Sequence, residues 1–179
     1  MHHLDAVRYF ENDSLQAVEL PYSGKELALV VLLPRQIDGC HALENSLTAA
    51  SLGTWLVQMT ERKVDLFLPR FKLESSFQLT QELAQMGLTA AFQSGADFSG
   101  MDGMRDLFIS ALFHKAWVEV NEEGTEAAAA TVGVISLTAV RREPAPPPVF
   151  RADHPFVFLI RDTRSGSLLF LGRLANPAK

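Results

Sequence analysis

Runs of apolar residues separated by turn residues predict two β-strands early in the chain. Residues 15–20 are apolar and β-prone, and residues 21–24 carry the proline, serine and glycine of a turn. Residues 27–33 then form a continuous apolar run that ends at Pro34. Because a strand needs such a composition when both of its faces are covered, we expect 27–33 to lie deep in a sheet.

Two segments have the spacing or the end signals of α-helices. Residues 43–59 carry apolar side chains at helical intervals, although a glycine weakens the middle of the segment. Residues 77–86 are preceded by Ser75 and Ser76, either of which could cap a helix, and are followed by Gly87, a residue common after a helix end. The sequence therefore predicts one helix over 43–59 and another over 77–86.

Further strands are predicted in the rest of the chain. Residues 64–73 alternate apolar and polar side chains toward their end, as a half-exposed strand does. Residues 107–120 also have strand character. Residues 156–160 and 168–171 are two strong strands joined by a Thr-Arg-Ser-Gly turn, which predicts a hairpin. Strands in blocks with a few helices predict an α+β fold.

The segment 121–150 differs sharply from its surroundings. Residues 125–131 are small and nearly featureless, whereas 144–148 read Pro-Ala-Pro-Pro-Pro and must be extended. As a strand, this segment would present one face made only of small residues, namely Thr125, Ala127, Ala129, Thr131 and Gly133. Such a face could enter a sheet at little steric or desolvation cost, although alanine also favours a helix. The composition suits both an exposed loop and a strand, as a conformational switch requires.

Composition and charge narrow the class of protein. The 179 residues are 47% hydrophobic, which fits one ordinary domain or two small ones with a packed core. The single cysteine excludes a disulfide framework within the chain. The net charge of −5 disfavours nucleic acid and anionic membranes as partners. The sequence has neither a signal-peptide pattern nor a long apolar run, so we expect no membrane-spanning helix.

Residues that could carry catalysis or bind a metal ion are few. The five histidines lack the spacing of zinc ligands, and no nucleophile elbow or phosphate-binding glycine loop is present. Asp97 and Asp102 flank a glycine but miss the ligand spacing of a calcium loop. Cys40 follows a turn glycine, and we do not expect its thiol to be catalytic. We therefore expect no catalytic residue, no metal and no cofactor, and an enzyme is the weakest hypothesis.

Two long runs resemble signatures of one protein family. Residues 114–131, which read HKAWVEVNEEGTEAAAAT, resemble the hinge of serpins. Residues 150–162, which read FRADHPFVFLIRD, resemble the serpin signature that follows the reactive loop. Shorter matches follow the family order at 20–24, 31–34, 68–71, 95–100 and 171–177. Because the matches extend over essentially the whole chain, the sequence is identified as that of a member of the serpin family.

The resemblance implies a fold and a mechanism. It implies mostly antiparallel sheets, a few helices and a reactive loop at about 121–150, within a serpin domain that spans residues 1–179. It also implies inhibition of serine proteases by a suicide-substrate mechanism. The protease cleaves the exposed loop, the cut loop inserts into a β-sheet as a strand, and the attached protease is distorted.

The resemblance further assigns a hinge and a reactive bond. The hinge residues are Glu122, Glu123, Gly124, Thr125, Glu126, Ala127, Ala128, Ala129 and Ala130. Counting from the hinge glycine places the reactive bond between Thr138 and Ala139, where a small residue suits an elastase-like or subtilisin-like protease. Counting back from Phe150 favours Arg142 instead. Arg141 or Arg142 would suit a trypsin-like protease, although solvated loop charge also explains this pair.

Three residues match positions where the main sheet of serpins opens. Arg70 and Glu122 match a charge pair at the top of that sheet, and His114 matches a histidine at its centre. The usual partner of this histidine belongs to a segment that the chain does not contain, so His114 could also be an ordinary core histidine.

The length departs from the family pattern, because the usual serpin chain is about twice as long. The resemblance therefore covers the C-terminal half of the fold, and the N-terminal half is missing. Two alternatives stay open: a protease inhibitor represented by a truncated chain, and a non-inhibitory fragment that binds a partner or is only a protease substrate. The family resemblance favours an extracellular location, and a cytoplasmic location is the alternative.

Overall fold

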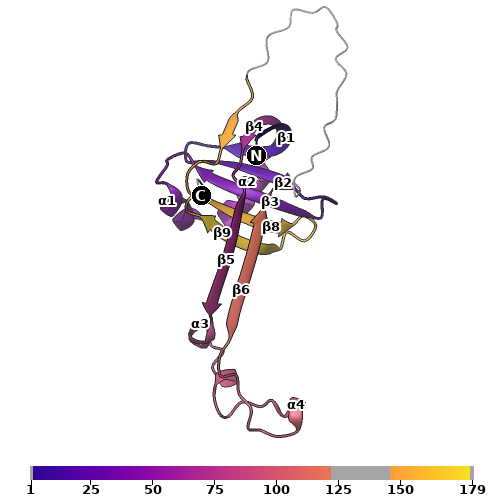
Figure 1. Ribbon diagram of the computed structural model, residues 1–179, viewed down its shortest axis with the longest axis vertical. Helices are drawn as coiled ribbons and strands as arrows, with labels where there is room; N and C mark the ends of the chain where they lie inside the picture. The colour runs from indigo at the N-terminus through magenta and orange to yellow at the C-terminus, as the bar shows by residue number, and fades with distance from the viewer. Residues whose placement is uncertain (1, 122–145, 178–179) are drawn as a thin grey trace, which may run out of the picture. The chain divides into compact units, whose positions relative to one another are not determined.

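The computed structural model describes residues 2–121 and 146–177 of the chain (Figure 1). The strands are β1 (His2–Glu11), β2 (Leu15–Pro21), β3 (Leu27–Pro34), β4 (Thr60–Phe67), β5 (Phe71–Gln78), β6 (Phe113–Val120), β7 (Val149–Arg151), β8 (Phe156–Asp162) and β9 (Leu168–Leu174). The α-helices are α1 (Cys40–Ser46), α2 (Ala49–Gln58), α3 (Thr80–Gln85) and α4 (Ser99–Asp102), and Ala90–Phe92 forms a 3₁₀ turn. Strands with a few short helices confirm the expected α+β class.

The described chain divides into two compact units. The larger unit comprises Met1–Phe71 and Val120–Lys179, apart from the residues outside the described ranges, and the smaller one is Lys72–Glu119. The larger unit holds a seven-stranded sheet in the order β7-β4-β1-β2-β3-β8-β9 (Figure 1). All of its described strand pairs are antiparallel except β4 with β7, which is parallel.

The strand β3 is buried on both faces, as its continuous apolar run predicted. On one face, Val30 and Leu32 join a cluster that includes Leu43 of α1 and Leu52 of α2. Residues of the opposite parity, such as Val31, face the other way and pair with Phe158 and its neighbours on β8. The helices α1 and α2 cover one face of β3, and the residues of the other face are buried as well.

The predicted helix over 43–59 is two helices, which corrects the sequence-based boundary. The chain leaves α1 at Leu47 in an extended conformation, and α2 starts from Thr48. The Oγ1 atom of Thr48 accepts a hydrogen bond from the Ser51 amide at 3.1 Å, and the Ser51 Oγ accepts one from the Thr48 amide at 2.8 Å. This reciprocal capping begins a new helix at the point where the apolar spacing appeared continuous.

The predicted strand over 64–73 is also two strands. Pro69 lies between β4 and β5 and has no amide hydrogen for a sheet ladder.

In the smaller unit, β5 pairs with β6, and two ion pairs cross this ribbon. The Lys72 Nζ lies 3.0 Å from a Glu119 oxygen, and the Lys115 Nζ lies 2.5 Å from a Glu74 oxygen. Early residues of β5 thus face late residues of β6, as in an antiparallel pair.

The helix expected at 77–86 begins later than predicted, because strand pairing extends β5 to Gln78. Ser75 and Ser76 are therefore strand residues rather than helix caps. The helix α3 starts at Thr80 and has no side-chain cap. Gly87 follows with φ of +103°, the left-handed conformation expected after a helix end.

The C-terminal hairpin is confirmed, whereas the strands β1 and β7 were not predicted. β8 and β9 pair across a turn in which Asp162 Oδ1 accepts hydrogen bonds from the amides of Arg164 and Ser165, both at 2.8 Å. These bonds lower the pKa of Asp162.

The N-terminal strand β1 was not predicted, and it pairs with both β2 and β4. In the described ranges, no helix is long and apolar enough to cross a membrane.

Gly172 on β9 provides a test of packing in the β8–β9 pair. A Cβ atom at this position would lie 2.6 Å from Cζ of Phe158, whose side chain is buried and packs against Phe71. We expect Gly172→Ala to lower the free energy of unfolding by about 1–3 kcal/mol, as overpacking does. Urea denaturation would measure the change.

Gly53 offers a matched control for the same substitution. It lies inside α2, and a Cβ there would meet no atom within 4 Å. Gly53→Ala should raise the free energy of unfolding by about 0.5–1 kcal/mol, because alanine is the better helix former. A Gly172→Ala variant as stable as the parent chain would show that Phe158 is not tightly packed.

Candidate functional site

The candidate site lies around the strand that follows the predicted reactive loop. Residues 146–148 lead into β7, which pairs with β4 at the edge of the sheet (Figure 1). The Asp65 amide donates to the Pro148 carbonyl at 2.9 Å, and the Ala152 amide donates to the Phe67 carbonyl, also at 2.9 Å. Between them, the side chain of Phe150 is fully buried. Backbone pairing and apolar burial thus attach the chain to the sheet immediately after the loop.

An aromatic stack reinforces this attachment. Phe67 is the register partner of Arg151 on β7 and of His2 on β1. The Arg151 guanidinium carbon lies 3.7 Å from the centroid of the Phe67 ring, and the His2 ring stacks on Phe67 at 4.1 Å. Because β4 lies between β1 and β7, the two side chains approach Phe67 from opposite sides. The His2 Nε2 also lies 2.6 Å from a carboxylate oxygen of Asp65. The three strands are therefore linked by side chains as well as by their backbones.

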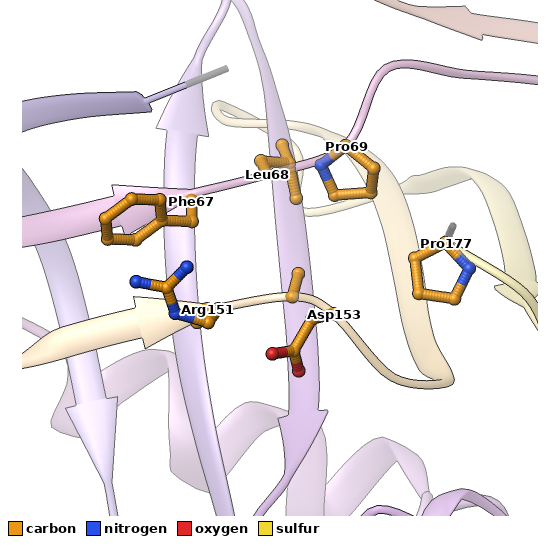
Figure 2. Close-up of a pocket in the computed structure, with 7 residues that line it drawn as sticks. Phe67, Leu68, Pro69, Arg151, Asp153 and Pro177 are labelled. Atoms are coloured by element: carbon orange, nitrogen blue, oxygen red, sulfur yellow. The ribbon is translucent and has the colours of Figure 1, made fainter. Parts of the chain in front are cut away.

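A small open pocket of about 220 Å³ lies beside this stack (Figure 2). It is lined by Phe67, Leu68, Pro69, Arg151, Ala152, Asp153 and Pro177. Figure 2 shows the Arg151 guanidinium beside the Phe67 ring, with the Asp153 carboxylate on the same side of the pocket. None of the described residues that line the pocket carries a hydroxyl, thiol or imidazole, and its charged groups are Arg151 and Asp153.

A polar network that is buried at Gln16 and Tyr9 and exposed at Glu11 and Arg35 also contacts β7. The Gln16 Nε2 donates to the Tyr9 hydroxyl oxygen at 2.6 Å and to the Val149 carbonyl at 3.0 Å. The Tyr9 hydroxyl in turn donates to a Glu11 carboxylate oxygen at 2.8 Å. Arg35 contacts the same Glu11 carboxylate at 2.5 Å.

Burial and hydrogen bonding shift the titration of this network. Burial raises the pKa of Tyr9 to about 12, and the neighbouring Glu11 carboxylate acts in the same direction. Burial opposes ionisation of Glu11, but the hydrogen bonds from Tyr9 and Arg35 outweigh it and lower the pKa of that carboxyl. At neutral pH the tyrosine is therefore a hydroxyl and the glutamate a carboxylate.

Most of the predicted site residues lie outside the described ranges. These are the hinge residues 122–130, the reactive-bond pair Thr138 and Ala139, and the alternative residues Arg141 and Arg142. Arg70 is exposed in the connection between β4 and β5. His114 is exposed on β6 in the smaller unit. The roles of these residues in sheet opening stay predictions.

Residues considered for other chemistry have structural explanations. Asp97 accepts hydrogen bonds from the Ser99 amide and hydroxyl, which lower the pKa of its carboxyl. Cys40 is buried, and this burial together with the nearby Glu44 raises the pKa of its thiol. In the part of the chain that the structure describes, no three acidic, histidine or cysteine side chains gather as metal ligands would.

The sequence interpretation missed the residues that hold β7. Gln16 and Tyr9 are far from residue 149 in the sequence, so no local spacing connects them. One signal was present: Gln16 and Glu19 are polar residues within the otherwise apolar strand β2, and both are buried. Because a buried polar side chain needs a partner, such residues predict a specific contact without identifying it.

Comparisons with known proteins agree with the family resemblance. The family model described as "Serpin (serine protease inhibitor)" matches residues 1–177. The human leukocyte elastase inhibitor is 46% identical over 179 residues, which cover 96% of this chain and 46% of the relative. An uncharacterized serpin-like protein of Thermococcus kodakarensis is 42% identical over 177 residues, which cover 99% of this chain and 41% of the relative.

A solved structure of uncleaved ovalbumin has the same fold. It matches with a TM-score of 0.79 and 32% sequence identity, over 99% of this chain and 44% of the ovalbumin chain. The chain therefore spans less than half the length of these relatives. Together with the family model that matches nearly every residue, these similarities show that the chain belongs to the serpin family of serine protease inhibitors.

Proposed function

We propose that this protein inhibits serine proteases as a suicide substrate, through a reactive loop at about 121–150. The observation that carries the proposal is the hinge-like sequence 114–131 in a chain that belongs to the serpin family. Relatives are named as inhibitors, and one such name specifies leukocyte elastase.

In the proposed reaction, the serine hydroxyl of the protease attacks the carbonyl carbon of Thr138. The Thr138–Ala139 bond breaks, an acyl ester to the protease forms, and the amine of Ala139 leaves with a proton. The loop residues before the cut then enter a β-sheet as a strand. Their small side chains from Thr125 to Gly133 favour this step, because they bring little bulk and few polar groups into the sheet.

A small residue such as Thr138 before the cut suits an elastase-like protease, and two of the relatives are named leukocyte elastase inhibitor. We therefore infer an elastase-like target, with a subtilisin-like protease as the next choice. Cleavage after Arg141 or Arg142 by a trypsin-like protease is the alternative. These positions require different substrate pockets, so a panel of proteases separates them.

A second candidate function is binding to a partner without inhibition. The chain covers 46% of the human elastase inhibitor, so it spans less than half the length of that relative. Four consecutive residues of β9, Leu168–Leu171, are between 38% and 59% exposed, although all four are large and apolar. A partner or the remainder of a longer protein would cover this surface, and a chain used in this way would be cleaved by proteases without trapping them.

The location of the protein stays an expectation. The family resemblance favoured an extracellular location, and the relatives give that location no support. A cytoplasmic location remains the alternative inferred from the sequence.

The inhibitory mechanism predicts a covalent complex with an elastase-like protease. Incubation of the chain with elastase should give an adduct that survives SDS and equals the summed masses minus the released C-terminal peptide. Mass spectrometry should place the cut after Thr138. Cleavage there without an adduct would support the substrate alternative, and an adduct formed with trypsin alone would move the reactive bond to Arg141 or Arg142.

The hinge provides a separate test of loop insertion. We expect Ala129→Arg to reduce the trapped fraction of protease by at least about tenfold, because insertion would bury an unpaired guanidinium at a cost of several kcal/mol. The loop should still be cut, since the reactive bond is unchanged. Ala129→Ser is the matched control and should keep most of the trapping. Equal trapping by both variants would contradict insertion of this face.

A further inference from the structure

Only a few backbone hydrogen bonds can hold the strand β7 on the sheet. It has only three residues, and it lies at the edge of the sheet with β4 as its ladder partner. Short edge strands open readily, because few backbone hydrogen bonds must break together. A second attachment on the open side of β7 would therefore have a large effect on how firmly the strand is held.

The open side of β7 has such an attachment at Val149. The Pro148 carbonyl and the Ala152 amide both point toward β4, because each is hydrogen bonded to that strand. Backbone groups alternate between the two sides of a strand, so the Val149 carbonyl points away from β4. On a bare edge this carbonyl would have only water as a partner. Here it accepts a hydrogen bond from the Gln16 Nε2 at 3.0 Å.

This hydrogen bond joins strands that are not neighbours in the sheet. Gln16 belongs to β2, and the strands β1 and β4 separate β2 from β7 in the strand order. The sheet must curl strongly for the Gln16 side chain to reach β7. Gln16 is 8% exposed, so its amide depends on protein groups for its hydrogen bonds.

The surrounding network fixes the direction in which the Gln16 amide points. The Glu11 carboxylate is paired with Arg35 and lies 3.5 Å from Arg62, so it acts as an acceptor. Tyr9 must donate its hydroxyl hydrogen to Glu11, which leaves the hydroxyl oxygen free to accept from Gln16. The two hydrogens of the Gln16 Nε2 then go to Tyr9 and to Val149.

From this geometry we propose that Gln16 is a positioning residue that holds β7 on the sheet and thereby fixes the C-terminal attachment of the reactive loop. The consequence for the reaction rests on the proposed inhibitory function: with β7 held, the bond to be cut is presented to the protease from a fixed support. The consequence for the strand itself does not depend on inhibition.

Hydrogen exchange of the free protein tests the hold on the strand. Gln16→Met keeps a similar length and removes both donors. We expect the Asp65 and Ala152 amides to exchange about tenfold faster in this variant, because the buried network loses its hydrogen bond to β7. The amides of the β3–β8 pair should change less. Equal changes at both places, or no change at β7, would overturn the proposal.

A matched variant separates this effect from general destabilisation. Val18→Ala removes buried volume from β2, two residues from Gln16, and leaves the amide donors in place. It should accelerate exchange in the β3–β8 pair at least as much as at Asp65 and Ala152. If Val18→Ala loosened β7 selectively as well, the assignment to the Gln16 donors would be wrong.

A shorter amide keeps the test decisive if Gln16→Met does not fold. Gln16→Asn retains the donors but places them about 1.5 Å short of their partners, the length of one carbon–carbon bond. It should therefore also loosen β7 selectively. Protection at Asp65 and Ala152 equal to that of the parent chain would overturn the proposal.

The rate of adduct formation with elastase tests the consequence for the reaction. We expect Gln16→Met to slow adduct formation while Val18→Ala leaves the rate nearly unchanged. An unchanged rate with Gln16→Met would overturn the positioning role in the reaction. If the parent chain forms no adduct with any protease, the inhibitory function fails, and hydrogen exchange still decides whether Gln16 holds β7.

Discussion

The burial of β3 on both faces is the constraint around which the larger unit is organised. A strand made only of apolar residues must be covered on both faces, and in this chain α1 and α2 cover one face of β3 while the residues of the other face are buried as well. The hydrogen bond between Gln16 and Val149 requires the sheet to curl, because it joins β2 and β7, which two strands separate in the sheet order.

The two ends of the predicted reactive loop are attached in different ways. After the loop, the chain enters a three-residue strand held by backbone pairing, by the fully buried Phe150 and by the Gln16 amide. Before the loop, the chain leaves the two-stranded ribbon of β5 and β6, which belongs mainly to the smaller unit. A mechanism in which one side of a cut loop moves while the other stays needs such a difference between its supports.

Local sequence patterns predicted those parts of the fold in which neighbouring residues decide the structure. β2, β3, β8 and β9 were predicted because each is an apolar run next to a clear turn. The break between α1 and α2 was missed because Thr48 and Ser51 form a cap that apolar spacing does not reveal. The end of β5 was predicted wrongly, because pairing with β6 extends the strand through the two serines that could have capped a helix. β7 and its contacts were missed because Gln16 and Val149 meet only in three dimensions. The hinge and the reactive bond were assigned by resemblance and lie outside the described residues.

The parallel pairing of β4 with β7 has a consequence for the order in which the chain assembles. Asp65 and Val149 are register partners although a large part of the sequence separates them, whereas β2 and β3 are joined by a short turn. Contacts between distant residues form slowly, because the intervening chain must lose entropy before any contact compensates for it. The β2–β3 hairpin should therefore form before β7 joins β4, and the pairing of β3 with β8, whose register partners lie farther apart in the sequence, is slow for the same reason. During synthesis, the strand that supports the loop can join the sheet only after the whole loop has been made.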